Sequence, residues 1–183
     1  METKKYELTD EAIEFDGHTL HRIEALKDFG NVKKGHLGGW IEKEENLSQE
    51  GDCWVCRYAK VYNDAKIYED AKIFGNAEIY GNAKVYEDAI IFGNVEIYDN
   101  VEIYGAARIF DDAQIYGKTK VYDNAIVSGK AFIFGSPHIH GNARVSGKAM
   151  IYDIADICEN AIICGNGCVF GKSLVNGETI VCN

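Results

Sequence analysis

The clearest feature of the chain is an aliphatic residue that returns at every sixth position. From Val55 to Val181, an Ile or Val occupies the first position of all 22 hexads. The fifth position is small, usually Ala, and the third and fourth are turn-forming pairs such as Gly75-Asn76. Gly, Asn and Asp adopt left-handed backbone angles at little cost, so they favour a corner after each short strand. The pattern predicts short strands with one inward aliphatic side chain each, separated by tight corners.

The position after each inward aliphatic carries a second, longer period. From Tyr62 onward these residues run Tyr-Tyr-Phe and then repeat, which gives a period of 18 residues. A six-residue period does not follow the 3.6-residue turn of a helix. Three hexads therefore complete one coil, and the predicted fold is all-β: a triangular parallel β-solenoid of about seven coils, stacked about 4.8 Å apart.

The 18-residue period divides the outward side chains among three faces, named here by their aromatic residues. Side chains that flank an inward residue on a strand point outward. The Phe face carries Phe74, Phe92 and Phe110, the Tyr62 face carries Tyr62, Tyr80, Tyr98 and Tyr116, and the Tyr68 face carries Tyr68, Tyr86, Tyr104 and Tyr122. Tyr offers a large contact area at a small cost in conformational entropy. We therefore expect the two Tyr faces to form a binding surface for a protein partner of unknown identity.

Apolar residues on the Phe face and in the last coils predict a homo-oligomer. A contiguous exposed apolar stripe usually marks a contact surface. The expected interface residues are Phe74, Phe92, Phe110, Ile126, Ile162, Cys164, Phe170, Leu174, Ile180 and Cys182. A dimer is the first expectation and a trimer the second. In the alternative interpretation, the N-terminal hairpin folds over part of the Phe face.

Residues 1–36 lack the repeat and predict an N-terminal cap. Asp16-Gly17 separates two alternating segments, 12–15 and 19–23, and this dipeptide favours the tight turn of a β-hairpin. The end of a solenoid exposes unpaired strand edges, which a hairpin can cover. The sequence thus predicts a cap over residues 1–36 and a hexapeptide-repeat solenoid over residues 37–183.

The hexads resemble those of the hexapeptide-repeat family of left-handed parallel β-helices over residues 55–183. The strings Gly38-Gly39-Trp40, Leu47-Ser48-Gln49 and Gly51-Asp52-Cys53-Trp54 are similar to those of YdcK-type proteins of bacteria and their prophages, whose function is unknown. Left-handed coiling is what the resemblance implies. Some members of the YdcK type carry the label of transferase by analogy of fold, which is weak support for an activity.

Four residues near the end of the Tyr68 face are candidates for chemistry. His138 and His140 share that face, and the 18-residue period places Asp156 and Cys158 beside them in the next coil. Two imidazoles, a carboxylate and a thiolate could bind Zn²⁺. His140 could instead activate Cys158 as a nucleophile. The alternative is that the Tyr ladder simply ends here and its neighbours carry no chemistry.

Two classes of function follow. The first is a non-catalytic scaffold, a rigid oligomeric rod that presents the Tyr ladders and an acidic corner to a protein partner; a phage-encoded inhibitor of a host protein is one version. The acidic corner comprises Glu69, Asp70, Glu87, Asp88, Asp123, Glu159 and Glu178. The alternative, which the resemblance implies, is an acyltransferase that uses acyl-CoA with His138 or His140 as general base. Uninterrupted coils, without the loops that such enzymes use, favour the scaffold.

Charge and composition limit the classes of partner and the cellular location that we expect. The net charge of −10 argues against nucleic-acid binding, which needs clustered Lys and Arg. Apolar runs are too short for a transmembrane helix, and the first ten residues carry charges instead of the apolar core of a secretory signal. Six Cys without such a signal indicate reduced thiols and a cytoplasmic location. No cofactor is expected.

The cysteines suggest packing more than chemistry. Cys164 and Cys182 lie one coil apart, within reach of disulfide geometry, but a reducing cytoplasm predicts two buried thiols at the oligomer interface. Cys53 and Cys56 have the spacing of a dithiol pair, yet no redox fold accompanies them. We interpret both pairs as packing residues.

Overall fold

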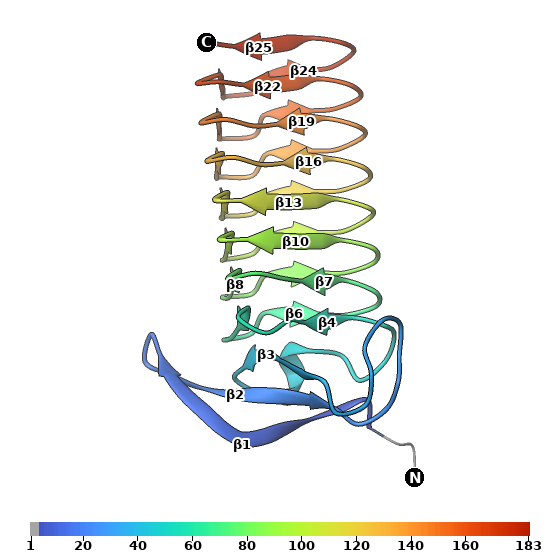
Figure 1. Ribbon diagram of the computed structural model, residues 1–183. Helices are drawn as coiled ribbons and strands as arrows, with labels where there is room; N and C mark the ends of the chain where they lie inside the picture. The colour runs from blue at the N-terminus through green and yellow to red at the C-terminus, as the bar shows by residue number, and fades with distance from the viewer. Residues whose placement is uncertain (1–3) are drawn as a thin grey trace.

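The computed structural model describes residues 4–183 and has the predicted all-β architecture. The chain winds into a column of stacked coils, with an antiparallel cap at its N-terminal end (Figure 1). Three parallel sheets form the three sides of the column. This triangular solenoid is consistent with the left-handed β-helix of hexapeptide-repeat proteins. Within residues 4–183, no helix is long and apolar enough to cross a membrane.

Each sheet corresponds to one of the faces expected from the aromatic period. The sheet of the Tyr62 face has ten strands: β1 (Tyr6–Phe15), β2 (His18–Ala25), β3 (Leu37–Ile41), β5 (Lys60–Val61), β8 (Glu78–Ile79), β11 (Glu96–Ile97), β14 (Gln114–Ile115), β17 (Phe132–Ile133), β20 (Met150–Ile151) and β23 (Cys168–Val169). The sheet of the Phe face has eight: β4 (Trp54–Val55), β7 (Lys72–Ile73), β10 (Ile90–Gly93), β13 (Arg108–Asp111), β16 (Ile126–Val127), β19 (Arg144–Val145), β22 (Ile162–Cys164) and β25 (Ile180–Cys182). The sheet of the Tyr68 face has seven: β6 (Lys66–Ile67), β9 (Lys84–Val85), β12 (Glu102–Ile103), β15 (Lys120–Val121), β18 (His138–Ile139), β21 (Asp156–Ile157) and β24 (Leu174–Val175).

The register of these sheets confirms the 18-residue coil. Ile103 pairs with Val85 on one side and Val121 on the other, each 18 positions away. Phe92 pairs with Phe110 in the same way. The inward side chains are buried from Val55 to Val175, and the small fifth-position residues are buried beside them as far as Gly167, whereas Ser173 and Thr179 in the last coil are exposed. Burial of the aliphatic file is the main source of the stability of the solenoid.

The structure has one coil more than the sequence predicts. Ile41 pairs with Val61 and Leu47 bridges to Ile67, each 20 positions on, whereas Val55 pairs with Ile73 after 18. The first coil therefore contains two extra residues, and a short 3-10 helix, η1 (Glu44–Asn46), lies within it. Because this coil departs from the strict period, the hexad pattern accounts for about seven coils and the structure has eight.

The N-terminal hairpin forms where Asp16-Gly17 predicts it. Phe15 pairs with His18 across the turn, and both turn residues have positive φ, 49° at Asp16 and 79° at Gly17. Strand β2 then pairs antiparallel with β3, which in turn pairs parallel with β5. The cap is thus continuous with the sheet of the Tyr62 face and covers the first coil.

The hairpin reaches the Phe face only at its beginning, where Tyr6 contacts Trp54, and leaves Phe74 and Phe92 exposed. The hairpin covers the start of the Tyr62 face, where Tyr62 is only 2% exposed. Phe15 packs edge-on against the Tyr62 ring, and Leu20 joins the same buried cluster. At the beginning of the Phe face, Tyr6 of the hairpin and Phe29 of the following segment both contact Trp54.

Two adjacent glycines allow the cap to approach the column. A Cβ atom on Gly38 would lie 2.6 Å from the Trp54 ring, and one on Gly39 would lie 2.5 Å from the carbonyl oxygen of Ala59. Contacts this short are not tolerated. Residues 38 and 39, at the junction between cap and solenoid, must therefore be glycine.

Lys5 anchors the beginning of the cap from within. Its side chain is 1% exposed, and Nζ donates hydrogen bonds to the carbonyl oxygens of Glu50, Gly51 and Cys53. Burial lowers the pKa of this amine, and the carbonyl oxygens compensate for the lost water. The sequence gives no sign of this role, because Lys5 lies outside the repeat.

The aromatic residues form continuous stacks along two faces. Tyr80 and Tyr98 stack with ring centroids 4.9 Å apart, and Tyr104 and Tyr122 stack at the same distance. Parallel aromatic pairs of this kind contribute about 0.5–1.5 kcal/mol each. Since the ring faces contact one another, mainly the ring edges and hydroxyl groups remain for a partner. The ladders therefore have a structural role in the column.

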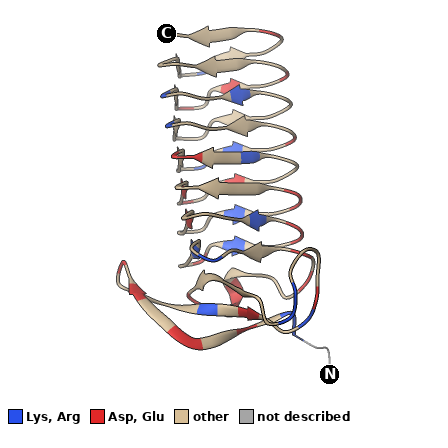
Figure 2. Ribbon diagram, viewed as in Figure 1, with Lys and Arg blue, Asp and Glu red and all other residues tan. Residues whose placement is uncertain are grey.

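The acidic corner also has a structural role. Glu69, Glu87 and Asp123 have left-handed backbone angles, with φ of 56°, 55° and 58°. Each carboxylate accepts a hydrogen bond from the backbone N–H of the residue 18 positions on, as Asp123 does from Gly141 at 3.0 Å. Acidic residues recur at the turns on the right-hand side of the column (Figure 2). These side chains therefore link the corners of successive coils.

Cys164 and Cys182 differ from the expectation of two buried thiols. They pair in register on β22 and β25, with Cα atoms 4.7 Å apart, and their sulfur atoms form a disulfide. Neither residue is fully buried, and Cys182 is exposed. The side chains of Leu174 and Ile180 in the same last coil are also exposed. Parallel pairing one rung apart brings the two Cα atoms within disulfide range.

Candidate functional site

The candidate site lies where the Tyr ladder of the Tyr68 face ends. His140 follows β18 and occupies the next place in the file after Tyr122. Its ring stacks on the Tyr122 ring with centroids 4.8 Å apart and planes 4° from parallel. The backbone N–H of His140 donates to the carbonyl oxygen of Ile157 at 2.9 Å, which fixes the position of the residue on the coil. The solenoid thus holds this imidazole in a defined plane.

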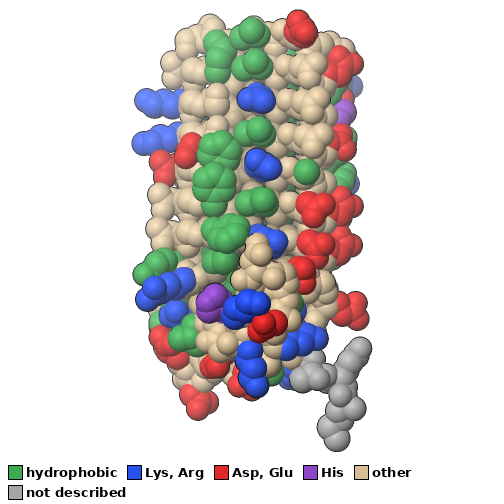
Figure 3. Space-filling view, turned by 45° about the vertical axis from the view of Figure 1, so that its right-hand side comes forward, with side chains coloured by type: hydrophobic (Ala, Val, Ile, Leu, Met, Phe, Trp, Pro, Cys, Tyr) green, Lys and Arg blue, Asp and Glu red, His purple; other side chains and the backbone are tan. Residues whose placement is uncertain are grey.

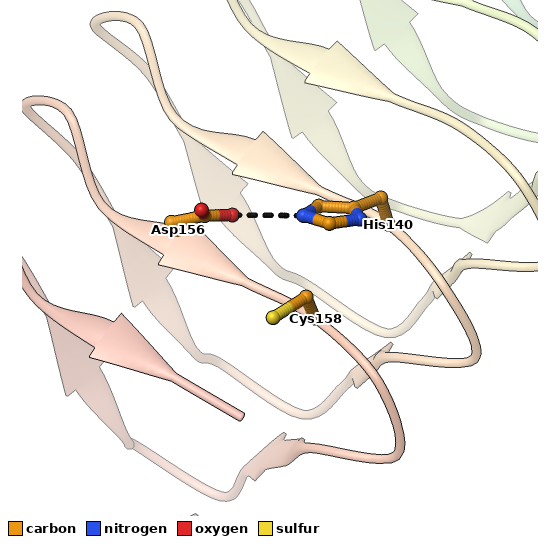
Figure 4. A group of neighbouring side chains, drawn as sticks. All are labelled: His140, Asp156 and Cys158. Carbon is orange, nitrogen blue, oxygen red and sulfur yellow. Dashed lines mark hydrogen bonds and ion pairs between the residues drawn. The ribbon is translucent and has the colours of Figure 1, made fainter. Parts of the chain in front are cut away.

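Asp156 at the start of β21 orients the ring of His140. The distance from His140 Nε2 to Asp156 Oδ1 is 3.0 Å (Figure 4). An ionised carboxylate can only accept, so this hydrogen bond places the proton on Nε2. In the neutral ring, Nδ1 then carries the free lone pair. Nδ1 lies 3.9 Å from Asp123 Oδ2, which is beyond hydrogen-bond distance.

The environment of Cys158 does not favour a nucleophile. Cys158 lies one coil beyond His140 in the same file (Figure 4), and its sulfur, an imidazole nitrogen of His140 and a carboxylate oxygen of Asp156 lie within 4.8 Å of one another. Burial raises the pKa of the Cys158 thiol, and the nearby carboxylates of Asp156 and Glu159 raise it further. A raised pKa lowers the thiolate fraction, and the thiolate is the reactive form.

The same three residues offer donors for a metal ion, but they fit zinc poorly. A nitrogen, a carboxylate oxygen and a sulfur are ligands that Zn²⁺ accepts. A tetrahedral zinc ion holds its ligand atoms roughly 3.5 Å apart, so the group would have to contract from its 4.8 Å spread. Nε2 of His140 already bonds to Asp156, and that bond would have to be given up. The arrangement of the three side chains therefore favours an oriented His140 imidazole over a bound zinc ion.

His138 lies outside this group. Its side chain is exposed, and its ring meets the edge of Tyr122 at a centroid distance of 6.4 Å. On the sheet it pairs in register with Lys120 and with Asp156. Of the four sequence candidates, the structure thus brings together His140, Asp156 and Cys158.

One residue of the site was missed in the sequence. Asp123 was assigned to the acidic corner, yet its carboxylate faces His140 Nδ1. The 18-residue period could have indicated this proximity, because the residue 18 positions after Asp123 is Gly141, the neighbour of His140. A period counted along one file of side chains does not show contacts between neighbouring files.

The expected binding and interface residues occupy the faces predicted for them, with one exception. Tyr62 is buried by the hairpin and cannot belong to an exposed surface, while the other ladder tyrosines are partly exposed. On the Phe face, Phe74 and Phe92 are 38% and 40% exposed. Phe92 and Phe110 stack at 4.8 Å, so these two rings form an apolar pair in the file that Phe74 begins.

Comparison with known proteins gives a limited similarity. No family model matches the chain. A stretch of 60 residues is 42% identical to part of an uncharacterised acetyltransferase of Escherichia coli (strain K12), YdcK. The match covers 28% of this chain and 18% of that protein, so the chain spans well under two thirds of its relative. Together with the 18-residue coils, the match shows a hexapeptide-repeat β-solenoid that is distantly similar to YdcK.

Proposed function

We propose that this protein transfers an acyl group from acyl-CoA to a small acceptor, with His140 as general base. The observation that carries the proposal is the hydrogen bond from His140 Nε2 to Asp156, which leaves Nδ1 as the basic nitrogen. The similarity to a protein named as an acetyltransferase supports the same reaction class. His140 is favoured over His138 because only His140 has a carboxylate partner that fixes its ring.

In the proposed reaction, Nδ1 takes the proton from an acceptor hydroxyl or amine as that group attacks the thioester carbonyl. The new bond joins the acyl carbon to the acceptor, the carbon–sulfur bond breaks, and the CoA thiolate recovers the proton from His140. The carboxylate of Asp123, 3.9 Å from Nδ1, would stabilise the positive ring between these steps. Asp156 keeps the ring in the plane set by Tyr122.

The experiment that tests the proposal is an acetyl-transfer assay on the purified protein. Acetyl-CoA would be incubated with a panel of small amines and hydroxyl compounds, and free CoA would be separated and measured by chromatography. We expect release of CoA that depends on the acceptor. Calorimetry would measure binding of acetyl-CoA itself. Absence of both acceptor-dependent release and acetyl-CoA binding would reject the proposed activity.

A second candidate function, that of a self-associating protein scaffold, is favoured by the Phe face. Hydrophobic side chains recur along the column there, with basic side chains between them (Figure 3). Phe74 and Phe92 are both more than a third exposed, which places apolar rings in water. We propose that two copies of the chain meet across this file, and that the Tyr edges on the other faces contact a further protein.

Replacing Phe92 by glutamate is expected to disrupt this association. The change places a charge in the middle of the apolar file, and a charge without a partner is costly to bury. Light scattering would measure the molecular mass as a function of concentration. Tyr104→Glu on the Tyr68 face is the matched control, since it also replaces a stacked aromatic residue. Self-association that persists in Phe92→Glu, or is lost equally in Tyr104→Glu, would place the contact elsewhere.

A further inference from the structure

A hollow of about 340 Å³ lies between the cap and the beginning of the Phe face. Its lining residues are Asn31, Val32, His36, Leu37, Trp54, Cys56, Arg57, Lys72 and Phe74. The segment before β3 forms one wall, and β4 and β7 with their following turns form the other. The volume falls within the range of small-molecule sites. The hollow lies on a different face from His140 and takes no part in the proposed reaction.

The hollow has an apolar base formed by aromatic residues. Trp54 is almost fully buried and is held edge-on by Phe29, with ring centroids 5.3 Å apart. Phe74 is 38% exposed and borders the hollow from the next coil. Burial raises the pKa of the Cys56 thiol to about 11, as expected in an apolar environment. A flat apolar group can therefore lie against these walls.

The charges around the hollow are all positive or neutral. Arg57, Lys72 and His36 contribute basic groups, and the lining contains no Asp or Glu, although the protein has a net charge of −10. Three lysines of the column, Lys60, Lys84 and Lys120, do pair with acids, as Lys60 does with Glu78. Within residues 4–183, neither Arg57 nor Lys72 forms an ion pair. Basic side chains gather at the lower end of the apolar file (Figure 3).

We infer that this hollow binds a small organic anion with a flat apolar body. The body would lie against Trp54 and Phe74, and the anionic group would contact Arg57 and Lys72. The Arg57 guanidinium lies over the Tyr58 ring but forms no ion pair in the described residues, and with the Lys72 ammonium group it suits a carboxylate or sulfonate, because charge-assisted hydrogen bonds are the stronger ones. Because the protein has a net charge of −10, the rest of its surface would repel such a ligand, and the basic rim of the hollow would attract it.

The probe for the test is 8-anilinonaphthalene-1-sulfonate, which combines a flat apolar body with one negative charge. We expect one molecule to bind per chain, with energy transfer from the two tryptophans, Trp40 and Trp54, and slower alkylation of Cys56. Lys72→Glu and Arg57→Glu should each weaken binding about tenfold or more. Lys66→Glu, an exposed lysine on the Tyr68 face with the same change of charge, is the matched control. Circular dichroism would verify that each variant is folded.

A neutral analogue separates charge recognition from simple apolar binding. N-phenyl-1-naphthylamine has a similar body without the sulfonate, and we expect it to bind about tenfold more weakly or worse and not to respond to Lys72→Glu. Equal binding of both compounds, or equal loss in Lys66→Glu, would overturn the inference. Failure of the anion to bind would also overturn it, and light scattering at the same protein concentration would show whether a second copy of the chain covers the hollow instead.

Discussion

Replacing His140 by glutamine is expected to lower the rate of acetyl transfer by about 10²–10⁴-fold, the usual contribution of a general base. Glutamine approximates the size of imidazole and can still bond to Asp156, but it cannot accept the proton of the acceptor. The rate of CoA release at saturating acetyl-CoA would measure the effect. Because His140 is partly exposed, with 26% of its side chain accessible, the fold should tolerate the change.

His138→Gln is the matched control for this prediction. It removes an imidazole from the same coil, two residues away, without changing either residue of the His140–Asp156 pair. We expect its rate to stay close to that of the unmodified protein. Asp156→Asn should give an intermediate loss, since an amide in place of the carboxylate no longer dictates the tautomer of His140. A full rate in His140→Gln, or an equal loss in His138→Gln, would refute the assignment of the base.

Replacing Ile103 by alanine is expected to destabilise the protein by about 2–5 kcal/mol. Ile103 is completely buried and lies between Val85 and Val121 in the middle of the column. Alanine would leave a cavity that neighbouring coils cannot close, because each rung is held at its spacing by backbone hydrogen bonds on three sheets. Urea unfolding followed by circular dichroism would give the change in the free energy of unfolding.

A pair of valines on the same face tests the role of neighbouring coils. Val121 is fully buried with a coil on each side, whereas Val175 lies in the last coil and is 8% exposed. In a quasi-one-dimensional fold, each inward residue depends on the coils directly above and below it. Val121→Ala should therefore lower the free energy of unfolding more than Val175→Ala does. Equal costs, or a loss under about 1 kcal/mol for Ile103→Ala, would argue against this account of stability.

Local chemistry explains why much of the fold was predictable. Asp16-Gly17 favours left-handed angles whatever surrounds it, and the turn forms there. The inward aliphatic recurs so regularly that a slip of one residue would expose Ile103 and its equivalents, so the register of the coils has no alternative. The first coil escaped prediction because two extra residues between Leu47 and Val55 interrupt the period.

The candidate site was only partly predictable. The period places Cys158 beneath His140, and both residues are where it predicts. It gives no information on which imidazole meets a carboxylate, because that depends on side-chain direction across neighbouring files. Asp156 pairs on the sheet with His138 yet bonds to His140, two residues further along the chain. Which group a side chain contacts depends on the neighbouring side chains of the folded protein.

The amino-acid sequence by itself determined the solenoid, its 18-residue coil and the three aromatic files, since these follow from a repeat that each residue obeys locally. Only the tertiary structure decided that the cap buries Tyr62, that His140 bonds to Asp156, and that the rim of Arg57 and Lys72 borders a hollow. These features join segments that share no period. Their geometry depends on how the cap and neighbouring coils pack, which is a property of the folded chain.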